Sequence, residues 1–160
     1  MKKIITISLM LFSLNAIAFT GIVTSVHDGD TLTVLNEKNV KENIRITKID
    51  TPEEPYKLRG QFIPKQPYAD EARDALKELC LGKQAEVRRV GKSYSRSVAF
   101  VSCGGVDVTE YQLKNGNAWF YRYSTGRAFK AMAAEAKAAK LGLWADPAAV
   151  EPYLWRRGKR

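Results

Sequence analysis

Three short runs rich in β-branched residues, each followed by polar turn residues, fill the first third of the chain and restrict it to a β-rich fold. The runs cover residues 22–26, 32–35 and 44–49. The first two are separated by residues 27–30, whose sequence His-Asp-Gly-Asp is typical of a tight hairpin turn. The first third of the chain is therefore predicted to be a β-meander.

Helical spacing of apolar residues appears later in the chain. Ala72, Leu76 and Leu79 recur on one face of a predicted helix, and Asp107 stands three residues before Glu110 as in a capping box. The pattern predicts, in chain order, a helix over 69–81, strands over 85–90 and 97–102 with a turn at 91–95, and helices over 107–116 and 125–141. Five strands with helices after the third and fifth indicate an α+β fold, a five-stranded OB-fold β-barrel with three flanking helices.

The segment 51–68 separates the meander from the first helix. It contains four prolines and one glycine, which predict an absence of regular structure: Pro52, Pro55, Gly60, Pro64 and Pro67. A loop of this length inside a compact domain is usually functional or disordered.

The amino terminus has the features of a secretory signal. Two lysines precede an apolar run over residues 4–14, and Ala16-Ile17-Ala18 supplies a small-x-small cleavage pattern. The run is well short of the roughly 20 residues that span a bilayer, so we expect no stable membrane insertion after cleavage. Residues 1–18 are predicted to be a signal peptide, 19–160 a single exported domain, periplasmic or secreted.

The two cysteines, Cys80 and Cys103, are predicted to form a disulfide. Export would place them in an oxidising compartment, and a hairpin turn centred on residue 93 would set Cys103 opposite Lys83, close to the end of the first helix. Two separate buried thiols are the alternative. His27 is the only histidine, so zinc sites and nucleophile pairs with histidine are poorly supplied, and any chemistry must come from carboxylates, arginines or a hard metal ion.

The charge balance points to a polyanionic partner. The chain has 26 Lys and Arg against 17 Asp and Glu, a formal net charge of +9. Nucleic acid and a membrane surface both fit such a charge, but the chain lacks the basic amphipathic helix that a membrane surface would favour.

Five charged residues have the types that phosphodiester hydrolysis requires. Asp30 and Asp50 are oxygen ligands suited to a hard cation, and Glu53 can orient or deprotonate a water molecule. Arg45 and Arg96 can clamp a phosphate through two parallel hydrogen bonds. Each also has an ordinary interpretation, as a turn, a solvated strand face or a helix cap. Asp50 is expected past the end of its strand, at the mouth of the following loop.

Several motifs, in order and spacing over residues 22–156, resemble the thermonuclease family, the micrococcal or staphylococcal nuclease type. They are Val26-x-Asp28-Gly29-Asp30-Thr31, Arg45-x-x-x-Ile49-Asp50-Thr51-Pro52-Glu53, Tyr94-x-Arg96, Gly116-x-Ala118-Trp119 and Gly142-Leu143-Trp144. The resemblance implies a five-stranded OB-fold barrel with three helices. It also implies a calcium-dependent nuclease that acts on DNA and RNA and leaves 3′-phosphate ends.

The resemblance also implies residue roles. Asp30, Asp50 and the Thr51 backbone carbonyl would bind Ca²⁺, with Asp28 supporting that shell. Arg45 and Arg96 would contact the scissile phosphate, and Glu53 would act on the attacking water, as a general base or by positioning it.

Two departures from the family pattern affect these roles. Lys92 replaces an acid and Ser95 a glycine in the turn before Arg96, so a positive φ at residue 95 would cost about 1 kcal/mol and could displace the arginine. Glu54, beside Glu53, could compete for the role on water.

Aromatic and basic residues near the carboxyl terminus complete the candidates. We expect Trp119 and Phe120 to be mainly structural, and Tyr94 with either Tyr121 or Tyr123 to line a substrate cleft and stack on bases. The terminal basic residues are expected to form a solvated tail: Arg156, Arg157, Lys159 and Arg160.

The sequence thus predicts an exported, monomeric, calcium-dependent endonuclease. The rival interpretation is a catalytically silent single-stranded nucleic-acid-binding module of the same fold. Carboxylates placed beside a polyanion argue against it, because binding alone gains nothing from them.

Overall fold

The computed structural model describes residues 18–58 and 60–159. Except for Ala18, the predicted signal peptide lies outside these residues. Ala18 is the first residue of β1 (Ala18–Val26), so a chain that starts at Phe19 keeps all but one residue of this strand. None of the helices in the described part of the chain is long and apolar enough to cross a membrane.

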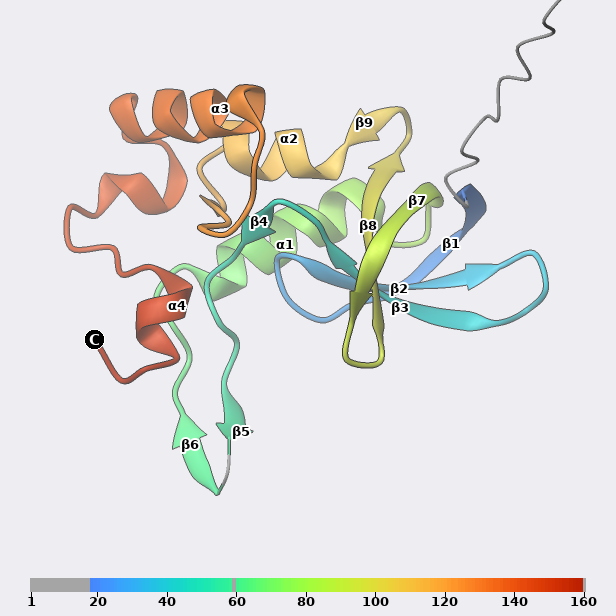
Figure 1. Cartoon of the computed structure of the whole chain (residues 1–160), viewed down its shortest axis with the longest axis horizontal. Coiled ribbons are helices and arrows are strands. Elements are labelled where there is room, and N and C mark those ends of the chain that lie inside the picture. The colour runs from blue at the N-terminus through green and yellow to red at the C-terminus, as the bar shows by residue number, and fades with distance from the viewer. Residues whose placement is uncertain (1–17, 59, 160) are drawn as a thin grey trace, which may run out of the picture.

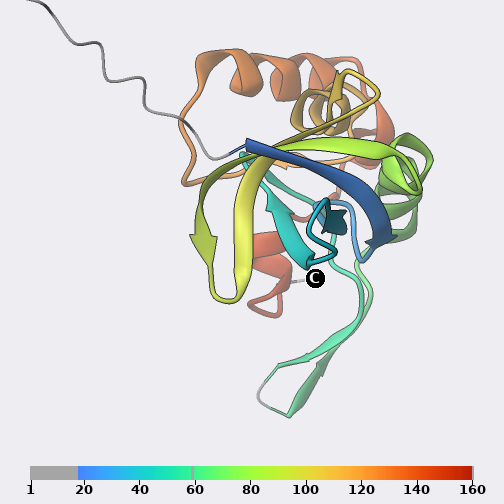
Figure 2. The same cartoon turned by 90° about the vertical axis from the view of Figure 1, so that its right-hand side faces the viewer.

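A closed five-stranded barrel forms the body of the molecule (Figures 1 and 2). Besides β1 it contains β2 (Thr31–Asn36), β3 (Lys41–Ile46), β7 (Gln84–Ser93) and β8 (Arg96–Cys103). The strand order is β3-β2-β1-β7-β8, and a parallel pairing of β3 with β8 closes the circle. A two-residue strand, β9 (Val106–Asp107), pairs antiparallel with the end of β8. The predicted α+β fold with a five-stranded OB-fold barrel is confirmed.

Alternation of buried and exposed residues explains why these strands close into a barrel. In β8 every second side chain is buried, and those of Val23, Ile44 and Val87 on other strands are fully buried in the same interior. Removing these apolar surfaces from water supplies the main driving force for closure.

Three helices cover the barrel as predicted. They are α1 (Ala69–Cys80), α2 (Val108–Lys114) and α3 (Arg127–Ala138). The Asp107 side chain accepts a hydrogen bond from the Glu110 N–H at 3.0 Å, which confirms the predicted cap of α2. Two one-turn helices, η1 (Gly142–Ala145) and α4 (Pro152–Trp155), are not predicted, because four residues are too few for a periodic pattern.

Two motif glycines bring the end of α2 against the segment after α3. Gly116 and Gly142 have φ values of 69° and 53°. A Cβ on Gly116 would lie 2.2 Å from the Leu141 carbonyl oxygen, and one on Gly142 would lie 2.4 Å from the Gly116 oxygen. Only glycine permits both the conformation and this approach, which gives the two motifs a structural origin.

The prediction that 51–68 lacks regular structure is wrong. This segment contains an antiparallel hairpin of β5 (Tyr56–Leu58) and β6 (Gln61–Ile63) that projects from the body of the molecule (Figures 1 and 2). Pro55 and Pro64 flank the two strands and leave their backbone donors intact, while Gly60, at φ 81°, lies in the turn between them.

The prediction that Asp50 lies past the end of its strand is also wrong. The predicted strand 44–49 is broken near Lys48, whose φ is 71°, and the chain then forms β4 (Ile49–Asp50). This strand pairs with β10 (Trp119–Phe120), and Asp50 lies opposite Trp119. The break at Lys48 ends the alternation of buried and exposed side chains in β3. Asp50 is therefore in a strand only because β10, about 70 residues further along the chain, pairs with it.

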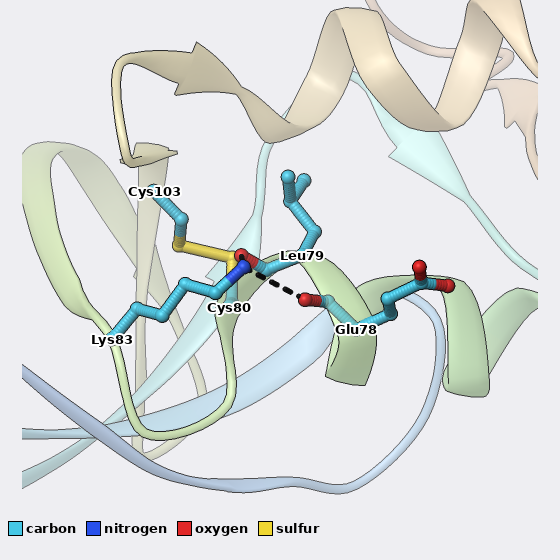
Figure 3. Close-up of a disulfide and its surroundings, with 5 residues drawn as sticks. All are labelled: Glu78, Leu79, Cys80, Lys83 and Cys103. Carbon is cyan, nitrogen blue, oxygen red and sulfur yellow. Dashed lines mark hydrogen bonds between the residues drawn. A yellow bond between two sulfur atoms is a disulfide. The ribbon is translucent and has the colours of Figure 1, made fainter.

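The predicted disulfide between Cys80 and Cys103 is confirmed (Figure 3). It joins the end of α1 to the end of β8, with Cα atoms 5.4 Å apart. The predicted register is wrong by two residues: the hairpin pairs Ser93 with Arg96, and an irregularity between Arg89 and Gly91 shifts the register by one, so that Cys103 lies opposite Ala85. Lys83 instead donates through Nζ to two carbonyls in the last turn of α1.

Candidate active site

Most of the predicted site residues line one open cleft of about 750 Å³, whereas Asp50 and Tyr123 are not among its lining residues. Its lining residues come in part from the tip of the β7–β8 hairpin, from β5 and from the residue that follows α4. In Figure 1 these elements lie on the side of the barrel away from α2 and α3. The lining of the cleft includes Asp30, Arg45, Glu53 and Arg96. Residues more than 60 positions apart in the sequence therefore share one surface.

The turn between β1 and β2 places Asp30 at the floor of the cleft. The Asp30 N–H donates to Asp28 Oδ1 at 2.9 Å, a local bond typical of Asp in tight turns. The Asp30 side chain is buried, with Oδ1 accepting from the Thr31 hydroxyl at 3.1 Å and Oδ2 from the Thr51 N–H at 3.3 Å. The two ends of the proposed ligand set, Asp30 and Thr51, are thus in direct contact.

Arg45 joins the two buried aspartates. It lies opposite Thr31 in the β2–β3 pairing, so its side chain reaches the carboxylate that follows the turn. Arg45 Nη2 is 3.2 Å from Asp30 Oδ2 and 3.0 Å from Asp50 Oδ1. Asp30 and Asp50 are each only 2% exposed, so water solvates their carboxylates little and the positive charge of Arg45 takes the place of that solvation.

Arg45 does not fully compensate the charge of Asp30 and its acidic neighbours. Burial raises the pKa of Asp30 to about 7; Arg45 opposes this rise, and the charges of Asp28 and Asp50 add to it. Burial also raises the pKa of Asp28. A divalent cation would relieve this excess of negative charge.

The donor set fits a hard cation with few protein ligands. In residues 18–58 and 60–159, no three acidic, histidine or cysteine side chains form a group that could hold a metal ion. The two aspartates would therefore be the side-chain ligands of the cation, and a backbone oxygen and water would complete its coordination shell. Oxygen donors of this kind suit Ca²⁺ or Mg²⁺ rather than a thiophilic metal.

Glu53 lines the cleft, whereas Glu54 faces α1. The Glu53 backbone is fixed by two bonds with Gln66, whose own amide donates to the Val150 carbonyl at 2.6 Å. Burial raises the pKa of Glu53, although Arg156 opposes the shift. The Glu54 carboxylate is held by Arg73 of α1, away from the cleft lining. Position therefore favours Glu53 for a role on water.

The altered turn before Arg96 leaves that arginine in the cleft. Tyr94, not Ser95, has the positive φ, at 55°, so the expected strain at Ser95 does not arise. Arg96 Nη1 lies 3.4 Å from the Thr31 hydroxyl, next to Asp30. Tyr94 is 98% exposed at the hairpin tip and also lines the cleft.

The two tyrosines that follow β10 differ in position. Tyr121 lines the cleft, and its N–H donates to the Lys48 carbonyl at 2.8 Å. Tyr123 does not line it and is 66% exposed, with its ring edge-on to those of Tyr121 and Tyr153. Trp119 packs edge-on against Trp144 at 5.0 Å, and Phe120 packs against the core, as predicted.

Arg156 is the residue that the sequence interpretation placed wrongly. It is not part of a solvated tail: its Nη1 and Nη2 donate to Asp50 Oδ1 and Oδ2 at 3.1 and 2.8 Å, and Nη1 also contacts Glu53. Burial alone would lower the pKa of Arg156, but its bonds to Asp50 and the charge of Glu53 raise it. Arg157 and Lys159 are exposed as predicted, and Arg160 lies outside the described residues.

A sequence signal for this contact exists beside Arg156. Pro152 and Trp155 are both buried, and Trp155 Nε1 donates to the Pro64 carbonyl at 3.0 Å. A proline at the start of a helical turn followed by a tryptophan is unusual for a solvated tail, and it anchors α4 against the segment after β6. Tyr56 was also missed: it lines the cleft, and its buried hydroxyl has no hydrogen-bond partner among residues 18–58 and 60–159.

Comparison with known proteins agrees with this geometry. A family model described as staphylococcal nuclease homologue matches residues 43–146. An uncharacterized endonuclease of Escherichia coli O157:H7 is 32% identical over 164 residues, covering 99% of this chain and 100% of the relative. An uncharacterized endonuclease of Haemophilus influenzae is 31% identical over 140 residues, 86% of this chain and 73% of the relative. A staphylococcal-like nuclease of Arabidopsis thaliana is 34% identical over 122 residues, 75% of this chain and 35% of the relative.

Proposed function

The chain belongs to the staphylococcal nuclease family and is a nuclease, and from this premise we propose an exported, calcium-dependent endonuclease that cleaves DNA and RNA with little sequence specificity. The observation that carries the proposal is the cleft lined by Asp30, Glu53, Arg45 and Arg96, with the buried Asp50 bonded to Arg45 behind it. Nucleic-acid binding alone would gain nothing from carboxylates placed beside a polyanion.

The residues of the cleft divide the chemistry among them. Asp30, Asp50 and the Thr51 carbonyl would hold the cation, which supplies positive charge to the phosphate oxygens when bound. Arg45 and Arg96 donate to the non-bridging oxygens of the scissile phosphate and stabilise the charge that develops there. Glu53 orients the attacking water and, as a base, accepts its proton.

The products follow from which bond breaks. The water oxygen forms a bond to phosphorus and its proton passes to Glu53, while the bond from phosphorus to the 5′-oxygen breaks and the departing 5′-oxygen takes up a proton from solvent water. The fragments carry a 3′-phosphate and a 5′-hydroxyl. This direction of cleavage rests on the resemblance to the family rather than on a contact in the cleft.

Low specificity is supported by the types of residue around the cleft. Arginines read phosphates, which DNA and RNA share. Tyr94, exposed at the hairpin tip, and Tyr121 offer flat rings on which any base can stack, at about 1–3 kcal/mol per base. Tyr123 lies outside the lining, so it contributes through its contact with the Tyr121 ring.

Calcium is favoured over magnesium because the shell is loose. Two aspartates, a carbonyl and water impose little geometry, whereas Mg²⁺ demands a tight octahedron and loses water reluctantly. So few carboxylates predict weak binding, with a Kd of roughly 10⁻⁴–10⁻³ M.

Export is supported by two separate features. The apolar run at 4–14 with its cleavage pattern resembles a secretory signal, and the Cys80–Cys103 disulfide suits an oxidising compartment. A single barrel with its own closed core is consistent with a monomer.

The deciding experiment uses the protein from Phe19 onward with single-stranded DNA and with RNA, in Ca²⁺, in Mg²⁺ and in chelator. We expect rapid cleavage of both substrates in Ca²⁺, much slower cleavage in Mg²⁺ and none in chelator. Full activity in chelator would remove the metal assignment, and tight binding without cleavage in Ca²⁺ would favour the silent binding module.

A further inference from the structure

The guanidinium of Arg156 occupies the same carboxylates that the proposed cation needs. Asp50 Oδ1 accepts from both Arg45 and Arg156, at 3.0 and 3.1 Å, and Oδ2 accepts from Arg156 at 2.8 Å. A carboxylate has about four acceptor positions in all. Three of those on Asp50 are therefore already used, two of them by Arg156.

A cation and this guanidinium would repel each other at such close range. Both are positive, both lie against Asp50, and the carboxylate is 2% exposed, so water screens them little. A cation held by Asp30 and Asp50 therefore displaces Arg156 from Asp50 or binds more weakly because of it.

The structure gives Arg156 a place to go. Its side chain is 29% exposed and lines the cleft, while the helix that carries it is anchored by the buried Trp155. The guanidinium can thus turn into the cleft without undocking α4. A phosphate presents the same pair of oxygen acceptors as a carboxylate, and arginine binds both with two parallel bonds.

We propose that Arg156 is a third phosphate-binding arginine. When the cation binds, the Arg156 guanidinium moves away from Asp50 and Glu53 and binds a phosphate of the nucleic acid. The proposal rests on the proposed function of the cleft. It makes Arg156 a competitor of the cation when no substrate is present and a ligand of the substrate when the cation is bound. Leaving Glu53 also frees that carboxylate for its role on water.

Arg157 provides a matched control. It is exposed, it carries the same charge one residue further on, and its guanidinium lies 4.6 Å from the centre of the Tyr153 ring rather than in the cleft. Arg157→Gln therefore removes one positive charge from the same end of the molecule without touching the carboxylates.

The first measurement is Ca²⁺ binding by calorimetry without nucleic acid. Arg156→Gln should bind Ca²⁺ several-fold more tightly than the wild type, because a competing charge is gone, and Arg157→Gln should match the wild type. Arg156→Lys keeps the charge but loses the paired bonds, so its affinity should fall between those of the wild type and Arg156→Gln.

The second measurement is binding of a short single-stranded phosphorothioate DNA, used because it should be cleaved slowly. In chelator the wild type and Arg156→Gln should bind it equally. Added Ca²⁺ should strengthen binding by the wild type and by Arg157→Gln more than binding by Arg156→Gln. In Ca²⁺, the slope of log affinity against log salt should also fall by about one phosphate contact in Arg156→Gln.

The opposite signs separate this proposal from a purely structural role. Undocking of α4 would weaken both Ca²⁺ and DNA binding, whereas the proposal predicts tighter Ca²⁺ binding and, in Ca²⁺, weaker DNA binding. Equal Ca²⁺ affinity in the wild type, Arg156→Gln and Arg156→Lys would overturn it, as would an unchanged DNA response to Ca²⁺. A wild type that neither binds Ca²⁺ nor cleaves DNA would instead overturn the proposed function.

Discussion

At the scale of single residues, the cleft depends on arginines placed against buried carboxylates. Arg45 contacts Asp30 and Asp50, and Arg156 contacts Asp50 and Glu53. Asp30 and Asp50 are each 2% exposed, so these guanidinium groups offset part of the free-energy cost of burying their charge. The same guanidinium groups are the ones suited to bind a phosphate.

Arg96→Lys tests the shape of one such group. An ammonium keeps the charge but not the two-pronged geometry, so we expect the cleavage rate to fall by about tenfold or more. Thermal stability should be unchanged, because the Arg96 guanidinium makes a long contact of 3.4 Å with the Thr31 hydroxyl. Steady-state rates on single-stranded DNA in Ca²⁺ measure the loss, and Arg88→Lys, on the exposed side of β7, is the control. Wild-type rates would show that Arg96 does not bind the phosphate.

The sequence predicted the members of the cleft whose chemistry stands in short motifs. Asp30 lies in a recognisable turn, and Arg45, Asp50 and Glu53 lie within nine residues of one another, so local spacing was enough to bring them together. Arg156 could not be found in this way. Its partners lie 103 and 106 residues away, and only the docking of α4 through Trp155 reveals the contact.

At the scale of elements, side-chain bonds reinforce the closure of the barrel. Glu42 of β3 accepts hydrogen bonds from Arg89 of β7 and Ser97 of β8. The hydrogen bond from Arg89 is the main cause that lowers the pKa of Glu42, and burial opposes it. This cluster links β3 and β8, whose parallel pairing closes the barrel, and joins both of them to β7.

Glu42→Gln should lower the free energy of unfolding by about 1–3 kcal/mol at pH 7, since it removes a charged acceptor. The lowered pKa means that the ionised form of Glu42 stabilises the fold above the usual carboxyl range near pH 4.3. The difference from wild type should therefore disappear as the pH falls through the lower pKa of folded Glu42. Urea unfolding at a series of pH values measures it, with the exposed Glu86→Gln as control. A difference that persists undiminished in acid would refute the charge-based account.

The disulfide between α1 and β8 stabilises the fold by lowering the conformational entropy of the unfolded chain. Replacing both Cys80 and Cys103 by Ser should lower the free energy of unfolding by about 3 kcal/mol, because the bridge closes a loop with a sequence separation of 23. Urea unfolding of the variant and wild type measures the loss. Alkylation without reductant, followed by mass spectrometry, checks the bridge itself: labelling of both wild-type cysteines would rule it out.

The elements that sequence predicted best are those with regular patterns. The five barrel strands and three longer helices follow from alternation, helical spacing and the Asp107 cap. The misassigned pieces, β5–β6, β4–β10 and α4, are two to four residues long and depend on partners far along the chain. Such short elements carry no periodic signal, and tertiary contacts decide their structure.

At the scale of the whole molecule, charge and architecture serve the same end. A net charge of +9 favours association with a polyanion, while the acidic residues needed for chemistry lie in or directly behind one cleft. The barrel carries this cleft, and residues of the β7–β8 tip, of β5 and after α4 complete its lining. Figures 1 and 2 show how these elements project from the barrel. Nucleic acid is thus attracted by the molecule as a whole and cleaved at one place.

The central claim is that this cleft is the site of hydrolysis, with Glu53 acting on water. The most direct test compares single-turnover cleavage of single-stranded DNA in saturating Ca²⁺ by Glu53→Gln and by Glu54→Gln, which lies outside the cleft and is held by Arg73. The account predicts a loss of about 10²–10⁴-fold for Glu53→Gln and almost none for Glu54→Gln. A wild-type rate in Glu53→Gln, or a large loss confined to Glu54→Gln, would contradict it.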